Sequence, residues 1–528
     1  MTFSRGGSPS SKIQQTEISC PHSLAPLWTL NELIDGVSGR LVHKDLADRW
    51  DQEKEPEEPA EAVYGVSIDS RTISPGEVYF AIKGKLHDGH SFVDQAFQHG
   101  AVISVIEEGR LDEMSSGRRY ITVPDVDDAL RSLGRAARQR SQGVIIAVTG
   151  SVGKTSTKEI LHRILTPYGK VQVSSKSFNN HWGVPLTLSR LSPDSDYCVL
   201  EIGSDHPGEI AQLVSLVQPH IAIVTAIAPA HIGNFSGITD IAKEKACLFE
   251  AFPDQTDDTG KTPSQTNIPG TAIINADTAE AEMLINTAKA KKARVFTFGE
   301  SKSSTMRLVS TSSKGVCGTG VSAIISDSNE ALSYCIGAPG KHLVMNSLAA
   351  LTTLRSLGLD LTRATEQLAH LRAIEGRGQL TDLYLNKKDP SSPTRALLID
   401  ESYNANPASM HAALNLLNEI GEAEYRRRIA VLGDMADLGD QSPELHAKLN
   451  EVVRQSGLDK VFLVGPLMEN LWKLLPLELR GGYAHSPEMI GPILLSCIQA
   501  GDVIMIKGAN YMRMHVLVEN LKTQFSTR

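Results

Sequence analysis

The stretch that decides the fold spans residues 144–155 and reads Val-Ile-Ile-Ala-Val-Thr-Gly-Ser-Val-Gly-Lys-Thr. An apolar run of strand length is followed by a Gly-rich turn and by a helical pattern with an apolar stripe at 160–165. A strand, a Gly-rich loop and a helix start form a phosphate cradle, because small residues let backbone N–H groups approach an anion at the helix N-terminus. The stretch predicts a nucleotide site, and a plain Gly-rich turn is the alternative.

The loop itself suggests roles for two side chains. Lys154 is placed to reach the terminal phosphates of a nucleotide, and the Thr155 hydroxyl to ligate Mg²⁺. The usual pattern has a Gly five residues before the second Gly, where this chain has Val148, so the loop is the shorter Gly-x-x-Gly-Lys-Thr form. The candidate nucleotide-binding residues are Gly150, Ser151, Val152, Gly153, Lys154, Thr155 and Ser156.

Length and composition exclude several classes of protein. A chain of 528 residues is long enough for about three domains. Its net charge of −9 argues against a general nucleic-acid-binding surface. No apolar run approaches the ~18 residues of a membrane span, and the polar start lacks the apolar core of a secretion signal. The six cysteines are scattered without metal-type spacing and are predicted to be reduced, mostly buried thiols of a cytoplasmic protein.

The N-terminal part divides into two segments. Residues 1–26 are predicted to be a disordered lead, and 27–142 a small α/β domain with a helix near Trp28–Ile34 and a solvated acidic loop at 51–61. Ser70 and Arg71 follow Asp69 in a turn between strand-like runs. A hydroxyl, a carboxylate and a guanidinium fork suit a nucleotide or diphosphate, although an ordinary turn has the same composition.

Residues 143–374 have an alternating strand and helix pattern, which predicts a central, doubly wound, mainly parallel sheet. The strand candidates are Val144–Val148, Tyr197–Ile202, Ile221–Ile227, Thr271–Asn275 and Val295–Phe298. A helix is expected at 349–357 and a surface insertion at 253–270.

Residues 375–528 begin a second strand series and predict a smaller, Rossmann-like domain interrupted by a loop at 387–393. The strand candidates are Ala396–Asp400, Ile429–Gly433, Val461–Gly465 and Val503–Ile506. The predicted fold class is therefore α/β, with three domains.

Four further clusters carry chemical groups. Glu201 ends a strand, where an acid beside a phosphate loop holds Mg²⁺ directly or through water, or pairs with a surface lysine. His231 follows the next strand, and a lone histidine is more often structural than a metal ligand. Lys243 and Lys245 lie in one helix and have the pattern of surface charges.

The fourth cluster, residues 400–407, reads Asp-Glu-Ser-Tyr-Asn-Ala-Asn-Pro between a strand and a helix. Its side chains suit sugar hydroxyls or amines. The alternative is a helix cap, for which Asn406 before Pro407 is well placed.

Taken together, these motifs resemble the Mur ligase family from about Val66 onward. The family pattern is seen at 149–155, at 179–187 (Asn-Asn-His-Trp-Gly-Val-Pro-Leu-Thr), at 201–210, at 400–407, at 431–435 and at 507–508. The order of the motifs also matches. The resemblance is strongest to members that join D-alanyl-D-alanine to UDP-N-acetylmuramoyl-tripeptide.

The resemblance implies a set of metal ligands. It assigns Thr155 and Glu201 to an Mg²⁺ that bridges the nucleotide phosphates, and His231 and a carbamylated Lys245 to a second Mg²⁺. Lys245 is favoured over Lys243 because Phe249 follows it by four residues, as in relatives. Carbamylation turns a cation into an oxygen-donor anion, which suits Mg²⁺.

The resemblance also implies the other binding residues. Asn346 would contact adenine, Arg377 phosphate and Asp400 ribose, so that 143–374 is the ATP-binding domain and 375–528 the ligase domain. The substrate residues would be Ser70 and Arg71 for the UDP group of the N-terminal domain, and Tyr403, Asn404 and Asn406 for the amino substrate. Lys154, Lys245 and His231 are the expected catalytic residues.

The implied activity is ATP-driven amide formation through an acyl phosphate, by a cytoplasmic monomer whose third domain closes on the substrates. Three departures affect amino-substrate binding: Cys247 and Asp437 stand where Glu is common, and Ala509-Asn510 replaces Ser-Arg. A sister ligase that adds diaminopimelate, lysine or glutamate is one alternative, although the Asp-Asn-Pro-Arg signature of the diaminopimelate-adding relative is missing. A non-catalytic nucleotide-binding protein is the other.

Overall fold

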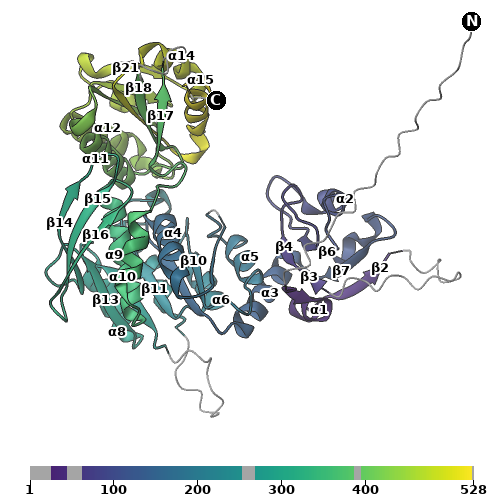
Figure 1. The fold of residues 1–528 in the computed structure, drawn as a ribbon. Coiled ribbons are helices and arrows are strands. Elements are labelled where there is room, and N and C mark those ends of the chain that lie inside the picture. Colours follow the sequence, from purple (N-terminus) through teal and green to yellow (C-terminus); the bar gives the residue numbers. More distant parts are fainter. Residues whose placement is uncertain (1–24, 45–61, 176, 253–267, 386–393, 526–528) are drawn as a thin grey trace, which may run out of the picture. The chain divides into compact units, whose positions relative to one another are not determined.

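The computed structural model describes residues 25–44, 62–175, 177–252, 268–385 and 394–525. The chain divides into two compact units, Met1–Leu133 and Gly134–Arg528 (Figure 1). The described strands form sheets of two, five, nine and six strands. The predicted acidic loop at 51–61 and the loop at 387–393 lie outside the described residues, as do most of the predicted lead 1–26 and most of the insertion at 253–270.

The first unit contains the five-stranded sheet, in the order β2-β7-β6-β5-β4. Its strands are β2 (Arg40–His43), β4 (Gly65–Ser67), β5 (Glu77–Phe80), β6 (Ile103–Glu107) and β7 (Arg119–Val123). The helices are α1 (Leu30–Val37), α2 (Val93–Gln98) and α3 (Val126–Arg140), which continues into the second unit. Helix α1 begins later than predicted, because Thr29 and Glu32 form a capping box and Trp28–Thr29 pairs as β1 with β3 (Ala62–Val63).

The nine-stranded sheet of the second unit has the order β16-β15-β14-β13-β12-β11-β8-β10-β9. Its parallel strands are β8 (Val144–Thr149), β9 (Val171–Val173), β10 (Tyr197–Glu201), β11 (Ile221–Val224), β12 (Thr271–Asn275) and β13 (Arg294–Gly299). All five predicted strands are present. Strand β11 ends at Val224 and not at Ile227, and the next residue, Thr225, bonds through its side chain to the carbonyls of Thr149 and Val152.

An antiparallel extension, missed from the sequence, completes this sheet: β14 (Met306–Ser313), β15 (Thr319–Ile325) and β16 (Glu330–Ile336). Helices α4 (Lys154–Leu165), α9 (Lys341–Ser356) and α10 (Leu361–Ala369) pack together against the sheet in one apolar core. Helix α9 contains most of the predicted helix at 349–357. The other helices are α5 (Gly183–Ser189), α6 (Glu209–Val217), α7 (Ile238–Ala246) and α8 (Ala281–Ala290).

The six-stranded sheet has the order β17-β18-β22-β19-β20-β21 and is parallel except at β17. Its strands are β17 (Gln379–Tyr384), β18 (Arg395–Glu401), β19 (Arg427–Gly433), β20 (Lys460–Val464), β21 (Arg480–Ala484) and β22 (Asp502–Lys507). The helices are α11 (Pro407–Glu424), α12 (Ser442–Gln455), α13 (Glu469–Trp472), α14 (Pro487–Cys497) and α15 (His515–Phe525). The four predicted strands are present, and β17 and β21 are additional.

Strand order places the site. Strand β8 lies between β10 and β11, so the carboxyl ends of these three parallel strands meet at one edge of the sheet. Ligands of open α/β sheets bind at this edge, where the chain leaves neighbouring strands in different directions. The phosphate loop, Glu201 and Thr225 all lie there.

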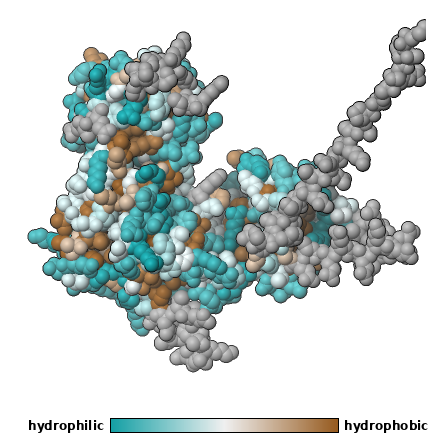
Figure 2. Space-filling view, viewed as in Figure 1, coloured by the Kyte–Doolittle hydropathy of each residue, from teal (hydrophilic) through white to brown (hydrophobic). Residues whose placement is uncertain are grey.

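Hydrophilic residues cover much of the face seen in Figure 2, between smaller hydrophobic patches. In the described part of the chain, no helix has both the length and the apolar character that crossing a membrane requires. The prediction of mostly buried cysteines is wrong for the five that are described: Cys198 is buried, three are half-buried and Cys317 is exposed.

Candidate active site

The phosphate loop requires glycine at two positions. Gly150 and Gly153 have φ values of 143° and 88°. A Cβ on Gly150 would lie 2.1 Å from Thr225 Oγ1, and one on Gly153 would lie 2.6 Å from Asn346 Oδ1. Thr225, which follows β11, and Asn346 of α9 therefore pack directly against the loop. A residue larger than glycine at either position would displace the loop.

The hydroxyls of Thr225 and Ser151 hold the phosphate loop against the segment that follows β11. Thr225 Oγ1 donates to the carbonyls of Thr149 and Val152. Ser151 Oγ donates to the Ala228 carbonyl at 2.8 Å and accepts from the Ala228 N–H at 3.0 Å. Sequence reasoning missed Thr225, because its partners lie more than 70 residues away.

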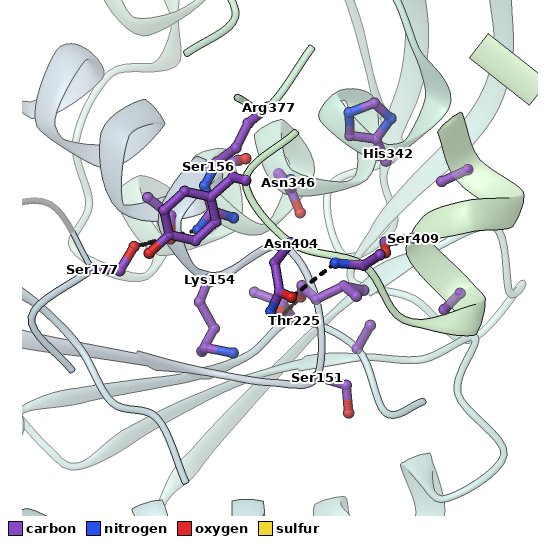
Figure 3. Close-up of a pocket in the computed structure, with 18 of the residues that line it drawn as sticks. Ser151, Lys154, Ser156, Ser177, Thr225, His342, Asn346, Arg377, Asn404 and Ser409 are labelled. Atoms are coloured by element: carbon purple, nitrogen blue, oxygen red, sulfur yellow. Dashed lines mark hydrogen bonds between the residues drawn. The ribbon is translucent and has the colours of Figure 1, made fainter. Parts of the chain in front are cut away.

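Lys154 lies at the start of α4, with its ammonium 2.7 Å from the Gly150 carbonyl. Burial lowers its pKa from the ordinary value, while attraction to the Glu201 carboxylate opposes that change. Figure 3 shows the lysine beside the same hollow as Ser177, Asn346 and Arg377. A cation at this point is suited to binding the phosphates of a nucleotide.

Thr155 and Glu201 form an oxygen cluster next to the lysine. Thr155 Oγ1 donates to Glu201 Oε2 at 2.8 Å, and Asn179 Nδ2 donates to Glu201 Oε1 at 2.8 Å. Glu201 is 1% exposed, and its carboxylate is therefore held rigidly. A carboxylate and a hydroxyl are hard oxygen donors, which fit Mg²⁺.

His231 is in the left-handed region, with φ 54°, just after the turn that follows β11. Its Nδ1 lies 3.1 Å from Asp437 Oδ2 and its Nε2 lies 3.5 Å from Asp205 Oδ1. Within the described residues, no three or more His, Cys, Asp and Glu side chains gather as a ready-made metal site.

The two lysines of α7 have opposite environments. Lys243 is exposed and pairs with Asp240 at 3.0 Å. Lys245 is 4% exposed, and its Nζ lies 2.7 Å from Ser204 Oγ. Burial and the nearby charge of Lys154 lower the pKa of Lys245 to about 7. The surface-charge interpretation therefore fits Lys243 but not Lys245.

The segment between the two sheets adds an arginine. The Arg377 guanidinium lies over the Tyr403 ring at 4.1 Å from its centroid, and its Nη2 is 3.3 Å from Ser177 Oγ. Stacking on an aromatic face holds a guanidinium in place without removing its charge. Arg377 therefore brings a second cation to the hollow that holds Lys154 (Figure 3).

The motif at 400–407 has mixed roles. Asp400 does not line the cavity: its buried carboxylate accepts from the Gly376 and Ser402 N–H groups and from the Ser402 hydroxyl. Asn406 caps α11, since its Oδ1 accepts from the Ser409 N–H at 2.9 Å. Tyr403 and Asn404 do line the cavity. The helix-cap alternative is thus observed for Asn406.

A buried ion pair adjoins this motif. Lys507 Nζ lies 3.2 Å from Glu401 Oε2 and donates to the Asn404 carbonyl at 2.9 Å. Both charged side chains line the cavity, and neither was assigned a role from the sequence. The departure at 509–510 lies close by, because Asn510 Nδ2 donates to the Tyr403 carbonyl at 3.2 Å.

The cavity measures about 440 Å³. Of the sequence-predicted residues it collects those of the phosphate loop from Ser151 to Ser156, with Glu201, His231, Asn346, Arg377, Tyr403 and Asn404. Gly150, Lys245, Asp400 and Asn406 are not among the residues that line it. The lining residues that sequence reasoning left without a role include Ser177, Asp205, Thr225, Asn275, His342 and Ser409.

Ser70 and Arg71 belong to the other unit. Ser70 is buried, and its hydroxyl donates to Gln95 Oε1 at 2.7 Å. The exposed Arg71 guanidinium pairs with Asp69 at 2.8 Å. Of these two side chains, only Arg71 presents its charged group to solvent.

Three family models match the chain. Residues 148–354 match the Mur ligase middle domain, 391–510 the Mur ligase, glutamate ligase domain, and 62–140 the Mur ligase family, catalytic domain. Together these matches include residues of both units, and Arg377 lies between the ranges 148–354 and 391–510.

Whole-length relatives carry one activity in their names. The UDP-N-acetylmuramoyl-tripeptide–D-alanyl-D-alanine ligase of Escherichia coli K12 is 31% identical over 437 residues, which cover 83% of this chain and 86% of that protein. The Bacillus subtilis protein of the same name is 28% identical over 470 residues, 88% of this chain and 94% of that one.

Solved structures have the same fold. A crystal structure of MurF from Acinetobacter baumannii is 26% identical, with a TM-score of 0.76, and the match covers 94% of this chain and all of that one. MurF ligase from Thermotoga maritima in complex with ADP is 24% identical, with a TM-score of 0.68 over 87% of this chain and 97% of that one. The three-domain α/β architecture predicted from the sequence is confirmed.

Proposed function

This chain belongs to the Mur ligase family, and we infer from that membership that it joins D-alanyl-D-alanine to UDP-N-acetylmuramoyl-tripeptide, using ATP with Mg²⁺. The product is a precursor of peptidoglycan. One observation supports placing this reaction in the cavity: Lys154, the Thr155–Glu201 pair and Arg377 all line it.

The reaction requires activation of a poor electrophile. The terminal carboxylate of the tripeptide attacks the γ-phosphorus of ATP, and ADP leaves, which gives an acyl phosphate. The amine of D-alanyl-D-alanine then attacks the acyl carbon and loses a proton, which forms the amide C–N bond; the C–O bond between the acyl carbon and the phosphate breaks, and inorganic phosphate leaves with that oxygen. Both substrates of the first step are anionic, so the site must offset their repulsion.

We assign that electrostatic task to Lys154 and Arg377. Lys154 stands at a helix start where backbone N–H groups also face the anion, and Arg377 approaches from the segment preceding β17. Because Arg377 is held on Tyr403, its charge is oriented before substrate arrives. Asn346, packed on Gly153, is assigned to the adenine.

The oxygen donors fit the implied metal. Thr155 and Glu201 would hold one Mg²⁺, and His231 with a carbamylated Lys245 would hold a second. Bound Mg²⁺ would neutralise phosphate charge during transfer. The chain's own part is to fix these ligands: Asn179 orients the Glu201 carboxylate, and Ser204 holds the Lys245 amine.

The carbamate proposal is supported by the state of the Lys245 amine. CO₂ adds to a neutral amine with loss of one proton, and a protonated lysine does not react. The pKa of about 7 leaves much of the amine neutral near neutral pH. Lys243 is instead exposed and pairs with Asp240.

We assign the amino substrate to the wall formed by Tyr403, Asn404 and the Lys507–Glu401 pair. Lys507 supplies a cation for a carboxylate, and Glu401 an anion for an ammonium group. Asn510 supports this wall through the Tyr403 carbonyl. The Cys247 thiol instead donates to the Lys243 carbonyl of the preceding helix α7.

The remaining assignments stay predictions. Arg71 and Ser70 are proposed to bind the UDP group, with residues 27–142 as the UDP-substrate domain. A cytoplasmic location follows from a reaction that consumes ATP and a nucleotide-linked precursor. We also propose that the enzyme acts as a monomer.

The decisive experiment measures phosphate release from ATP with UDP-N-acetylmuramoyl-tripeptide, with and without D-alanyl-D-alanine. The proposal requires release that depends on both substrates. Release that instead depends on a single amino acid, such as diaminopimelate or lysine, would identify a sister ligase. No release under any combination would indicate a non-catalytic nucleotide-binding protein. Lysine-type and diaminopimelate-type tripeptides, compared in the same assay, identify the third residue of the substrate.

A further inference from the structure

His231 is held between two carboxylates that lie on different sides of its ring. Nδ1 is 3.1 Å from Asp437 Oδ2, and Nε2 is 3.5 Å from Asp205 Oδ1. His231 and Asp205 line the cavity, and Asp437 does not. The Nε2 side of the imidazole therefore faces the cavity, and the Nδ1 side faces the turn that contains Asp437.

We propose that Asp437 is a positioning residue that fixes the tautomer and the orientation of the His231 imidazole. A carboxylate at Nδ1 accepts the Nδ1–H bond, which leaves the Nε2 lone pair directed into the cavity. A neutral imidazole with a free Nε2 lone pair is the form that binds a metal ion. The inference rests on the proposed function, which assigns His231 to the second Mg²⁺.

The backbone shows that this contact is built into the fold. His231 and Asp437 both have left-handed φ values, 54° and 59°, which are uncommon for residues other than glycine. The Gly233 N–H donates to the Asp437 carbonyl at 3.1 Å. Gly233 also packs so closely on Gly439 that an added Cβ would lie 2.6 Å from the Gly439 nitrogen. Two turns distant in sequence are thus locked together beside the histidine.

Stability does not explain the pair. The His231 and Asp437 side chains are 28% and 52% exposed, and a polar contact that is open to solvent contributes little to folding. The contact requires an unfavourable left-handed backbone conformation at both His231 and Asp437, and it adds little stability. Its role is therefore better explained as orienting the His231 imidazole.

The test reads the tautomer directly in the full-length enzyme without nucleotide or metal. The chain is labelled with ¹⁵N-histidine, His231→Gln assigns the signals, and spectra are recorded about two pH units above the ordinary histidine pKa of about 6.5. The variants are Asp437→Gly, which keeps the left-handed backbone but removes the carboxylate, and Asp437→Asn, whose amide oxygen still accepts. Asp440→Ala, an exposed acid three residues away, is the matched control.

We expect the Nδ1–H form of His231 in the wild type, Asp437→Asn and Asp440→Ala, and a mixture with Nε2–H in Asp437→Gly. The Mg²⁺ concentration for half-maximal turnover should rise about 10–100-fold in Asp437→Gly only, the usual effect of losing such a partner. An Nε2–H form in the wild type, or an unchanged tautomer in Asp437→Gly, overturns the proposal. Because the tautomer is read without substrate, a wild type that lacks ligase activity would refute the proposed function separately.

Discussion

Lys245 offers the sharpest prediction, because the structure gives its amine an unusual state. With a pKa of about 7, about half of the amine is neutral at pH 7, against about one part in 2,500 for an ordinary lysine with a pKa of 10.4. The reactive form is thus enriched about a thousandfold. Lys243, two residues away, keeps an exposed ammonium paired with Asp240 and serves as the matched control.

We expect Lys245→Ala to lose two or more orders of magnitude in kcat, and Lys243→Ala to retain wild-type turnover, because only Lys245 is placed to supply a carbamate oxygen. In wild type supplied with ¹³C-bicarbonate, a carbamate carbon signal should appear, and it should be missing in Lys245→Ala. Because the neutral amine is required, the signal should rise as pH increases from 6 to 8, where the neutral fraction grows from about a tenth to about nine tenths.

Two outcomes would refute this reasoning. One is a ¹³C spectrum without a carbamate signal at any pH in a fully active enzyme. The other is an equal loss of turnover in Lys243→Ala and Lys245→Ala, since burial would then not be what distinguishes the two lysines. Thermal unfolding of both variants checks that the fold is kept, because truncating a buried side chain also removes packing.

Three further predictions concern the phosphate loop and the core. Lys154→Ala should lower kcat by orders of magnitude with an unchanged thermal midpoint, and near-wild-type turnover would refute the role of the loop. Thr155→Val should raise the Mg²⁺ requirement and lower the free energy of unfolding by about 1–3 kcal/mol, because Glu201 loses a donor; unchanged Mg²⁺ dependence would contradict the metal assignment. Burial lowers the pKa of His220 to about 4, so the wild type should lose up to about 3 kcal/mol as pH falls from about 6.5 to 4, whereas His220→Asn, whose amide oxygen can accept from Ile145, should lose less. Urea unfolding of both proteins across that pH range measures these free energies, and an equal loss in wild type and His220→Asn would refute the role of His220.

Local pattern was sufficient to predict much of the fold. Strands such as β8 and β10 are continuous apolar runs bounded by turns, and such runs are typical of parallel strands covered on both faces. The pattern failed where one face is open to solvent. Strand β14 ends in five exposed residues, and β21 begins Arg-Gly-Gly, so neither has a core-strand composition. Their strand state depends on pairing with neighbours, which no local window contains.

The site was predictable only in part, for a related physical reason. The loop from Gly150 to Thr155 carries its own signal, because its glycines and lysine are adjacent in sequence. The difference between Lys243 and Lys245 is one of burial, which depends on packing against Ser204 and not on helix composition. Thr225, Ser177 and His342 reach the cavity through strand order and helix packing, and nothing near them in sequence marks them.

The division of charge across the cavity has a consequence for the proposed mechanism. Lys154 comes from the phosphate loop, whereas Arg377 comes from the segment before β17 and is held by Tyr403 and Ser177. Ser177 itself lies 3.5 Å from the Thr155 hydroxyl, so one short chain of polar contacts joins the arginine to the Thr155–Glu201 pair. Anionic phosphates would then be bound by cations from both parts of the site at once. Water hydrolyses an acyl phosphate. If the phosphates are bound fully only when Lys154 and Arg377 both contact them, the intermediate would form only in a site that is closed and excludes water.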